Sequence, residues 1–146
     1  DICLIQLDGS FPYNDVIRPV CLPNDQILTE SYTSLTSTAS GWEISRVASG
    51  DTLNMANSRV MSSNICGVLF KNFTVKKSHL CTASVPSGVC FNDVGGPLTL
   101  RRGVYNYLLG VLIFTTPNTK VSGVYTSVPF YMDWIKKTTN STICSI

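Results

Sequence analysis

Short apolar or β-branched runs separated by turn residues fill most of this chain, and the pattern indicates an all-β sandwich or barrel. The most apolar stretch, residues 108–114, has the length of a buried strand. Residues 130–137 have the composition of a helix, with Phe130, Trp134 and Ile135 on one face and lysines in the last turn. Further strand candidates are residues 2–7, 57–61, 79–83, 97–100, 105–114 and 123–127, and residues 65–70 are a candidate short helix. The Ser/Thr-rich segment 29–40 is read as a lead-in to Gly41-Trp42.

Size and composition predict one globular unit. The chain has 146 residues, of which 44% are hydrophobic and 14% charged, enough to bury a core. The net charge of +2 comes from scattered residues, so no nucleic-acid partner is expected. No run of about 18 apolar residues occurs, so no membrane span is expected. The sequence starts without Met and inside a strand-like run, which favours a processed or partial chain.

The cysteines favour an extracellular disulfide framework. No Cys-x-x-Cys pair occurs and His79 is the only histidine, so neither a metal site nor another cofactor is predicted. Two sequons, at Asn72 and Asn140, agree with a secreted glycoprotein. The six cysteines are Cys3, Cys21, Cys66, Cys81, Cys90 and Cys144.

The segment from Gly88 to Leu98, Gly-Val-Cys-Phe-Asn-Asp-Val-Gly-Gly-Pro-Leu, carries the most specific motif. It resembles the nucleophile loop of the trypsin/chymotrypsin-like serine proteases, Cys-x-Gly-Asp-Ser-Gly-Gly-Pro-Leu. Val94 stands where that family has its serine. Acyl transfer needs a hydroxyl that a base can deprotonate, and an isopropyl group has no such proton. The positions that match are Cys90, Asp93, Gly95, Gly96, Pro97 and Leu98.

Other segments resemble the same family in the same order. Residues 1–7 are similar to the strand that carries the triad aspartate, and residues 17–23 to the linker between the two barrels. Ser40-Gly-Trp42 is similar to the start of the second barrel, with Glu43 replacing a glycine. Residues 123–126 and 131–135 are similar to the last strand and the C-terminal helix.

This resemblance implies the second half of a protease domain. The expected fold is a six-stranded antiparallel β-barrel over residues 41–128 with a C-terminal helix. Residues 1–28 would be a strand and linker left from the first barrel, and residues 29–146 the second barrel and helix. The first barrel, with the catalytic histidine and the activation cleavage site, has no counterpart in the sequence.

The resemblance also implies that no catalytic residue set is intact. Asp1 and Val94 occupy vestigial triad positions, and His79 is expected to be an ordinary structural or surface residue. Asn92 replaces the glycine of the oxyanion loop beside Asp93, where a Cβ crowds the approach to substrate. The specificity pocket is degenerate. Its positions are Gly88, Ile113, Phe114 and Gly123. Trypsin-like members carry aspartate at the position of Gly88, and Ile113-Phe114 replaces their Ser-Trp.

Asp93 in active members pairs with the amine that activation cleavage creates. That amine is not in this chain, so Asp93 is expected to be exposed, hydrogen-bonded to backbone N–H groups, or paired with another chain. An ordinary surface aspartate in a turn remains an alternative.

The family pattern implies a Cys66–Cys81 disulfide. The usual partner of Cys90 is missing from the loop after Phe114, and Cys21 often tethers a propeptide or light chain in the family. Cys3 and Cys144 are additions to the family pattern. The pairing of these four cysteines stays open, because four cysteines allow three connectivities.

Three functions compete. The first is a secreted serine protease homologue that has lost catalysis and acts by binding or regulation, with a protein partner, for example a disulfide-linked chain that supplies the first barrel. The second is one half of a two-chain endopeptidase, which Val94 opposes because a partner chain can donate a histidine but not this nucleophile. The third is a truncated or partial protease chain, which the unpaired strand at residues 2–7 favours.

Overall fold

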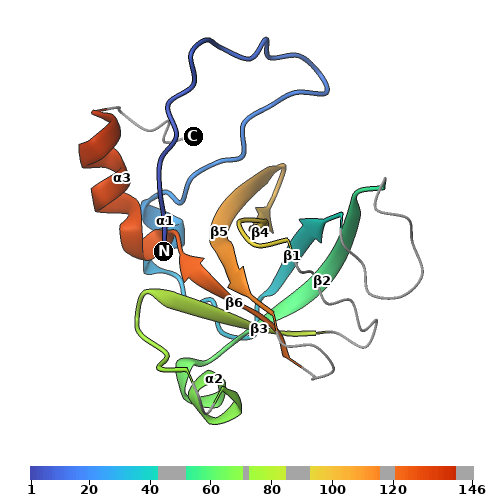
Figure 1. Ribbon diagram of the computed structural model, residues 1–146, viewed down its shortest axis with the longest axis vertical. Helices are drawn as coiled ribbons and strands as arrows, with labels where there is room; N and C mark the ends of the chain where they lie inside the picture. Colours follow the sequence, from blue (N-terminus) through green and yellow to red (C-terminus); the bar gives the residue numbers. More distant parts are fainter. Residues whose placement is uncertain (43–51, 71–72, 85–92, 116–120, 141–146) are drawn as a thin grey trace.

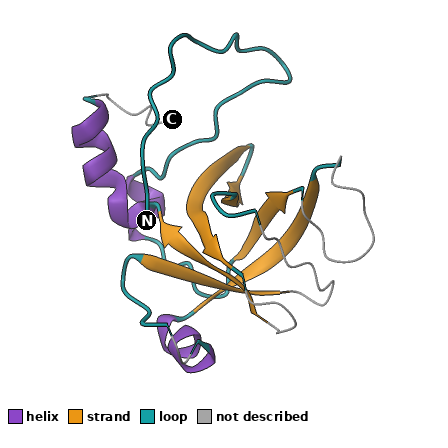
Figure 2. Ribbon diagram, in the orientation of Figure 1, coloured by secondary structure: helices purple, strands orange, loops and turns teal. Residues whose placement is uncertain are grey.

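The computed structural model describes residues 1–42, 52–70, 73–84, 93–115 and 121–140. Six antiparallel strands form a closed barrel in the order β1-β2-β3-β6-β5-β4, with the helices outside it (Figures 1 and 2). This confirms the predicted barrel and C-terminal helix. The strands are β1 (Thr36–Gly41), β2 (Asn54–Met61), β3 (His79–Ser84), β4 (Pro97–Arg102), β5 (Tyr105–Phe114) and β6 (Val121–Ser127). The helices are α1 (Asp25–Thr29), α2 (Ser63–Leu69), the 3₁₀ helix η1 (Pro129–Tyr131) and α3 (Met132–Thr139).

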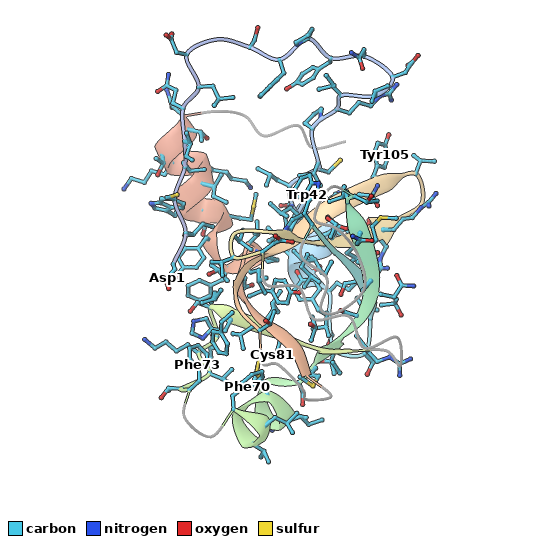
Figure 3. The ribbon with its side chains drawn as sticks, turned by 45° about the vertical axis from the view of Figure 1, so that its right-hand side comes forward. Asp1, Trp42, Phe70, Phe73, Cys81 and Tyr105 are labelled. Carbon is cyan, nitrogen blue, oxygen red and sulfur yellow. A yellow bond between two sulfur atoms is a disulfide. The ribbon has the colours of Figure 1, made fainter. Side chains whose placement is uncertain are left out.

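Alternating burial along the strands builds the barrel core. In β2, every second residue from Ala56 to Val60 is buried while the residues between them face solvent. The main cluster inside the barrel draws on five strands and α1, and its members include Ile27, Ala39, Ala56, Leu98, Leu100, Leu109, Leu112 and Tyr125. A second cluster lies between α2 and the barrel and contains Cys66, Phe70, Cys81 and Val124 (Figure 3). A third packs α3 on the barrel through Val128, Met132 and Ile135.

Two sequence predictions about strands were wrong. Residues 2–7 are not part of any sheet, although their pattern is strand-like. A strand needs a neighbour for its backbone groups, and the barrel is closed without this segment. The barrel begins at Thr36 rather than at residue 41, because β1 lies inside the Ser/Thr-rich segment. The small side chains of that segment suit a strand whose Ser37 and Ala39 are buried.

Helix α1 was not predicted. Asn24 caps it by accepting a hydrogen bond from the Ile27 N–H (3.1 Å). Ile27 is only 2% exposed and belongs to the barrel core. The proposed boundary between residues 28 and 29 therefore falls inside an element that packs on the barrel.

The first twenty residues run outside the barrel as an extended segment (Figure 1). Hydrogen bonds hold its two ends to the barrel. Thr126 Oγ1 donates to the Asp1 carbonyl (2.8 Å), and Cys21 pairs with β5 through its N–H to the Asn106 carbonyl (2.9 Å). Between these ends the segment exposes many apolar side chains: Leu4, Ile5, Leu7, Phe11, Tyr13, Val16, Ile17 and Val20. Among the described helices, none is long and apolar enough to cross a bilayer.

Candidate functional site

The turn from Asp93 to Gly96 presents Val94 to solvent. The Gly96 N–H donates to the Asp93 carbonyl (2.8 Å), and Gly95 takes φ +90° at the third position of the turn. Only glycine adopts that backbone region readily. The turn is also tied to β5, because the Gly95 N–H donates to the Leu112 carbonyl and the Leu112 N–H to the Gly96 carbonyl (both 2.9 Å). Val94 is 69% exposed at the second position, so any side chain at position 94 faces outward from a rigid support.

Asp93 is half-buried against the last residue of β1. A Cβ built on Gly41 would lie 1.8 Å from the Asp93 carboxylate oxygen Oδ2, so the carboxylate rests directly over the Gly41 Cα. Asp93 has interaction partners in the structure. It is therefore not a free surface aspartate, and the interpretation as an ordinary exposed turn residue does not fit.

The predicted pocket residues of β5 and β6 lie together. A Cβ on Gly123 would lie 3.0 Å from Leu112 Cδ1 and 3.3 Å from the Phe114 carbonyl oxygen. The Phe114 ring packs edge-on against Phe70 and Phe73, with centroids 5.7 and 5.1 Å apart. Ile113 also packs on this cluster, so this side of the site is apolar. Gly88 and Asn92, the other predicted positions, lie outside the described residues.

Tyr125, two residues after Gly123 on β6, adds no acid–base group. Its side chain is buried, and burial raises its pKa to about 12. The phenol therefore stays protonated at neutral pH and cannot act as a base there.

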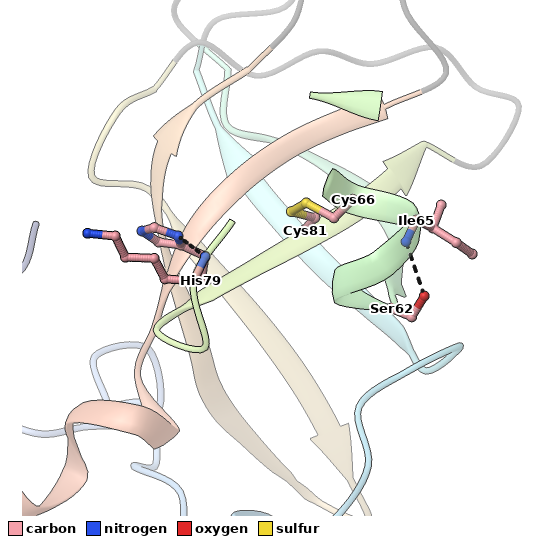
Figure 4. Close-up of a disulfide and its surroundings, with 6 residues drawn as sticks. Ser62, Ile65, Cys66, His79 and Cys81 are labelled. Atoms are coloured by element: carbon pink, nitrogen blue, oxygen red, sulfur yellow. Dashed lines mark hydrogen bonds between the residues drawn. A yellow bond between two sulfur atoms is a disulfide. The ribbon is translucent and has the colours of Figure 1, made fainter. Parts of the chain in front are cut away.

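His79 has a structural role. The His79 Nδ1 accepts a hydrogen bond from the Lys76 backbone N–H (3.0 Å, Figure 4). The backbone N–H of His79 in turn donates to the Lys76 carbonyl (3.0 Å), so two hydrogen bonds close this turn. Burial, then Lys76 and the N-terminal amine, lower the pKa of His79. Its strand neighbour Thr126 binds the Asp1 carbonyl, which places the first residue of the chain beside β6.

This hydrogen bond predicts a pH dependence. Protonated Nδ1 cannot accept the Lys76 N–H, and the pKa of His79 is lower in the folded chain than its usual 6.5. The unfolded chain therefore binds more protons below about pH 6.5, so stability falls as the pH drops from about 6.5 towards 5. Urea unfolding of wild type and His79→Asn at both pH values measures this. The asparagine oxygen accepts a hydrogen bond without titrating, so we expect a smaller loss in the variant, and equal losses would contradict the assignment.

Cys66 on α2 and Cys81 on β3 form a disulfide, with Cα atoms 6.0 Å apart (Figure 4). Ser62 caps α2 by accepting the Ile65 N–H (3.4 Å) and so orients the helix. Cys3 is exposed and Cys21 half-buried, and neither belongs to a disulfide in the described part of the chain. Cys90 and Cys144 lie outside the described residues, as does the sequon at Asn72. Asn140, the asparagine of the other sequon, is exposed at the C-cap of α3 and has φ 47°.

Two features of the site escaped the sequence reasoning. The first is the packing of Asp93 on Gly41, for which the only signal is a glycine at a strand end, a common mark of close backbone approach. The second is the hydrogen bond from the Lys76 N–H to the His79 Nδ1, for which the sequence carries no specific signal.

Comparisons with known proteins agree with this geometry. Residues 1–135 match the family described as Trypsin. The chain is 31% identical to ovochymase of Halocynthia roretzi over its whole length, but covers 10% of that protein. It is 32% identical to CLIP domain-containing serine protease B14 of Anopheles gambiae, with 94% of the chain and 41% of the relative aligned. For B4 of the same mosquito the identity is 28%, with 93% and 40% aligned. The chain thus spans less than half the length of each of these relatives, and it belongs to the trypsin family of serine proteases.

Proposed function

We propose that this chain is a secreted, non-catalytic serine protease homologue that acts by binding or regulation. Val94 is the observation that carries the proposal. It lies exposed on the turn whose family pattern has serine, and the two glycines that shape the turn remain. The turn thus keeps its support on β5 and offers an isopropyl group, which cannot attack a carbonyl.

The altered neighbours of Val94 support the same proposal. Asn92 stands at the oxyanion-loop glycine, and Gly88 lacks the charge that would select Arg or Lys. The β5 positions Ile113 and Phe114 belong to an apolar cluster rather than offering the Ser-Trp of the family pattern. Asp1 retains the triad aspartate position only as a vestige.

The exposed apolar side chains of the N-terminal segment support a protein partner. Ile5 is 80% and Val16 91% exposed, which is the type of surface that associates with another protein. We propose that residues 1–28 pack against a first barrel that a longer form of this chain or a disulfide-linked chain supplies. Exposed Cys3 is available for such a link. The Cys66–Cys81 disulfide and the two sequons support a secreted glycoprotein.

The names of the relatives favour one alternative. The two mosquito proteins are described as serine proteases, so this chain could be part of an active enzyme, either as a partial protease chain or as half of a two-chain endopeptidase. Val94 opposes both forms, because neither a longer chain nor a partner supplies a hydroxyl at this turn.

Labelling with a serine-directed fluorophosphonate tests the proposal. We expect no covalent adduct in the intact mass of the natural protein, while trypsin treated in parallel gains one. A stoichiometric adduct that maps to the barrel would show a working nucleophile and overturn the proposal. Mass measurement of the non-reduced natural protein reports at the same time whether a second chain is attached.

A further inference from the structure

The outer face of the barrel at β2, β1 and β4 carries two arginines without a charged partner. Arg59 is exposed in β2, where the residues on either side of it are buried. Arg101 is exposed in β4, and its Nε donates to the Gly103 carbonyl (3.2 Å). In the part of the chain that the structure describes, neither residue forms a salt bridge, whereas the adjacent Arg102 pairs with Glu30. The guanidinium groups of Arg59 and Arg101 are therefore available to a ligand.

The pairing of β1 with both of its neighbours brings these two arginines onto one row. Thr36 of β1 lies opposite Arg59 of β2. On the other side of β1, Thr38 pairs with Thr99 of β4. The same register, continued by two residues, places Thr36 opposite Arg101. Neighbouring strands are about 4.8 Å apart, so the Cα atoms of the two arginines are about 10 Å apart on the same side of the sheet.

No carboxylate of the strands opposes the two arginines, because the six described strands contain neither Asp nor Glu. Asp93 rests over Gly41, at the end of β1 away from the arginines. Glu43 and Asp51 lie outside the described residues, in the connection that leaves β1 at this Gly41 end. The helices lie at other sides of the barrel and do not cover the outer faces of β1 and β2 (Figures 1 and 2). The side chains around the arginines carry hydroxyl and amide groups and belong to Thr36, Thr38, Asn57, Thr99 and Asn106.

We infer that this face binds the sulfate groups of a sulfated polysaccharide. A guanidinium group holds an oxyanion through two parallel N–H donors, and the neighbouring hydroxyl and amide groups can hydrogen-bond to sugar hydroxyls. A polypeptide fits this face less well, because the closed barrel offers no free edge for an added strand and the row of the arginines has no apolar anchor. Nucleic acid fits less well too, because the row has no aromatic ring on which a base could stack. The inference does not depend on the loss of catalysis, since none of these residues belongs to the Val94 turn or the β5–β6 pocket.

Calorimetric titration with a heparin decasaccharide tests the inference. The control ligand is the same decasaccharide with its sulfate groups removed. We expect saturable binding of the sulfated chain that weakens as the NaCl concentration rises from about 0.05 to about 0.2 M, and no binding of the desulfated chain. Arg59→Gln and Arg101→Gln should each weaken binding about threefold, and the double variant about tenfold. The double variant should also lower the slope of log affinity against log salt concentration by about two.

A matched double variant separates this face from the overall charge of the protein. Lys77→Gln with Lys136→Gln removes two exposed cations elsewhere, so its net charge equals that of the double arginine variant. It should keep the affinity of wild type, and circular dichroism should show both double variants folded. Equal losses in the two double variants, or no binding by wild type, would overturn the inference. Equal binding of the desulfated chain, or of an oligothymidylate with as many negative charges as the heparin decasaccharide, would overturn it as well.

Discussion

Replacing both Cys66 and Cys81 with alanine should lower the free energy of unfolding by about 3 kcal/mol. The disulfide closes a loop with a sequence separation of 15, and its loss returns conformational freedom to the unfolded chain. The native state also depends on it locally, because Cys66 is the only buried residue of α2. Urea unfolding under non-reducing conditions measures the change.

Cys3→Ala is the matched control, because Cys3 is exposed and not in a disulfide. It should change the free energy of unfolding by less than about 0.5 kcal/mol. A loss below about 1 kcal/mol in the double variant would contradict the view that this bridge fixes α2 to the barrel.

Leu98→Ala should cost about 3 kcal/mol and lower the Tm by about 10 °C. Leu98 is 0% exposed and pairs with Ala39 of β1 on one side and Gly110 of β5 on the other. Both neighbours are small, so neither can fill the cavity that the truncation leaves. Val104→Ala removes an apolar side chain that is 80% exposed and should leave the Tm nearly unchanged. Similar shifts in the two variants, measured by calorimetry, would contradict the assigned core.

The barrel was predictable because its later strands are rich in β-branched and apolar residues. Segment 105–114 was predicted with the bounds that β5 has, since its run is long and strongly apolar. Strand β1 was missed because Thr36-Ser-Thr-Ala-Ser-Gly41 has the composition of a linker. Residues 2–7 show the opposite case, in which a strand pattern finds no partner strand. The hydrophobic pattern of a segment indicates which side chains it can bury, whereas its pairing into a sheet depends on which other strands are present.

The candidate site likewise has features that the sequence predicts and features that it does not. Val94 and its two glycines were found from sequence, because the loop motif fixes them by spacing. The contact of Asp93 with Gly41 joins residues 52 positions apart and follows only from the closure of β1 on β4.

The most direct test of the central claim is peptide turnover by wild type and Val94→Ser, with trypsin as positive control. Substrates with Arg, Phe and Ala before the scissile bond cover the main specificities of the family. We expect no turnover above background from either protein. Wild type has Val94 where the family has its serine, and loss of the triad serine alone lowers turnover in subtilisin by a factor on the order of 10⁶. The serine variant would still lack the histidine and carry Asn92, Gly88 and Ile113. Position 94 is 69% exposed, so unfolding would not explain a flat baseline in the variant. Hydrolysis by wild type would contradict the account outright, and hydrolysis by Val94→Ser would show that an additional chain completes the triad.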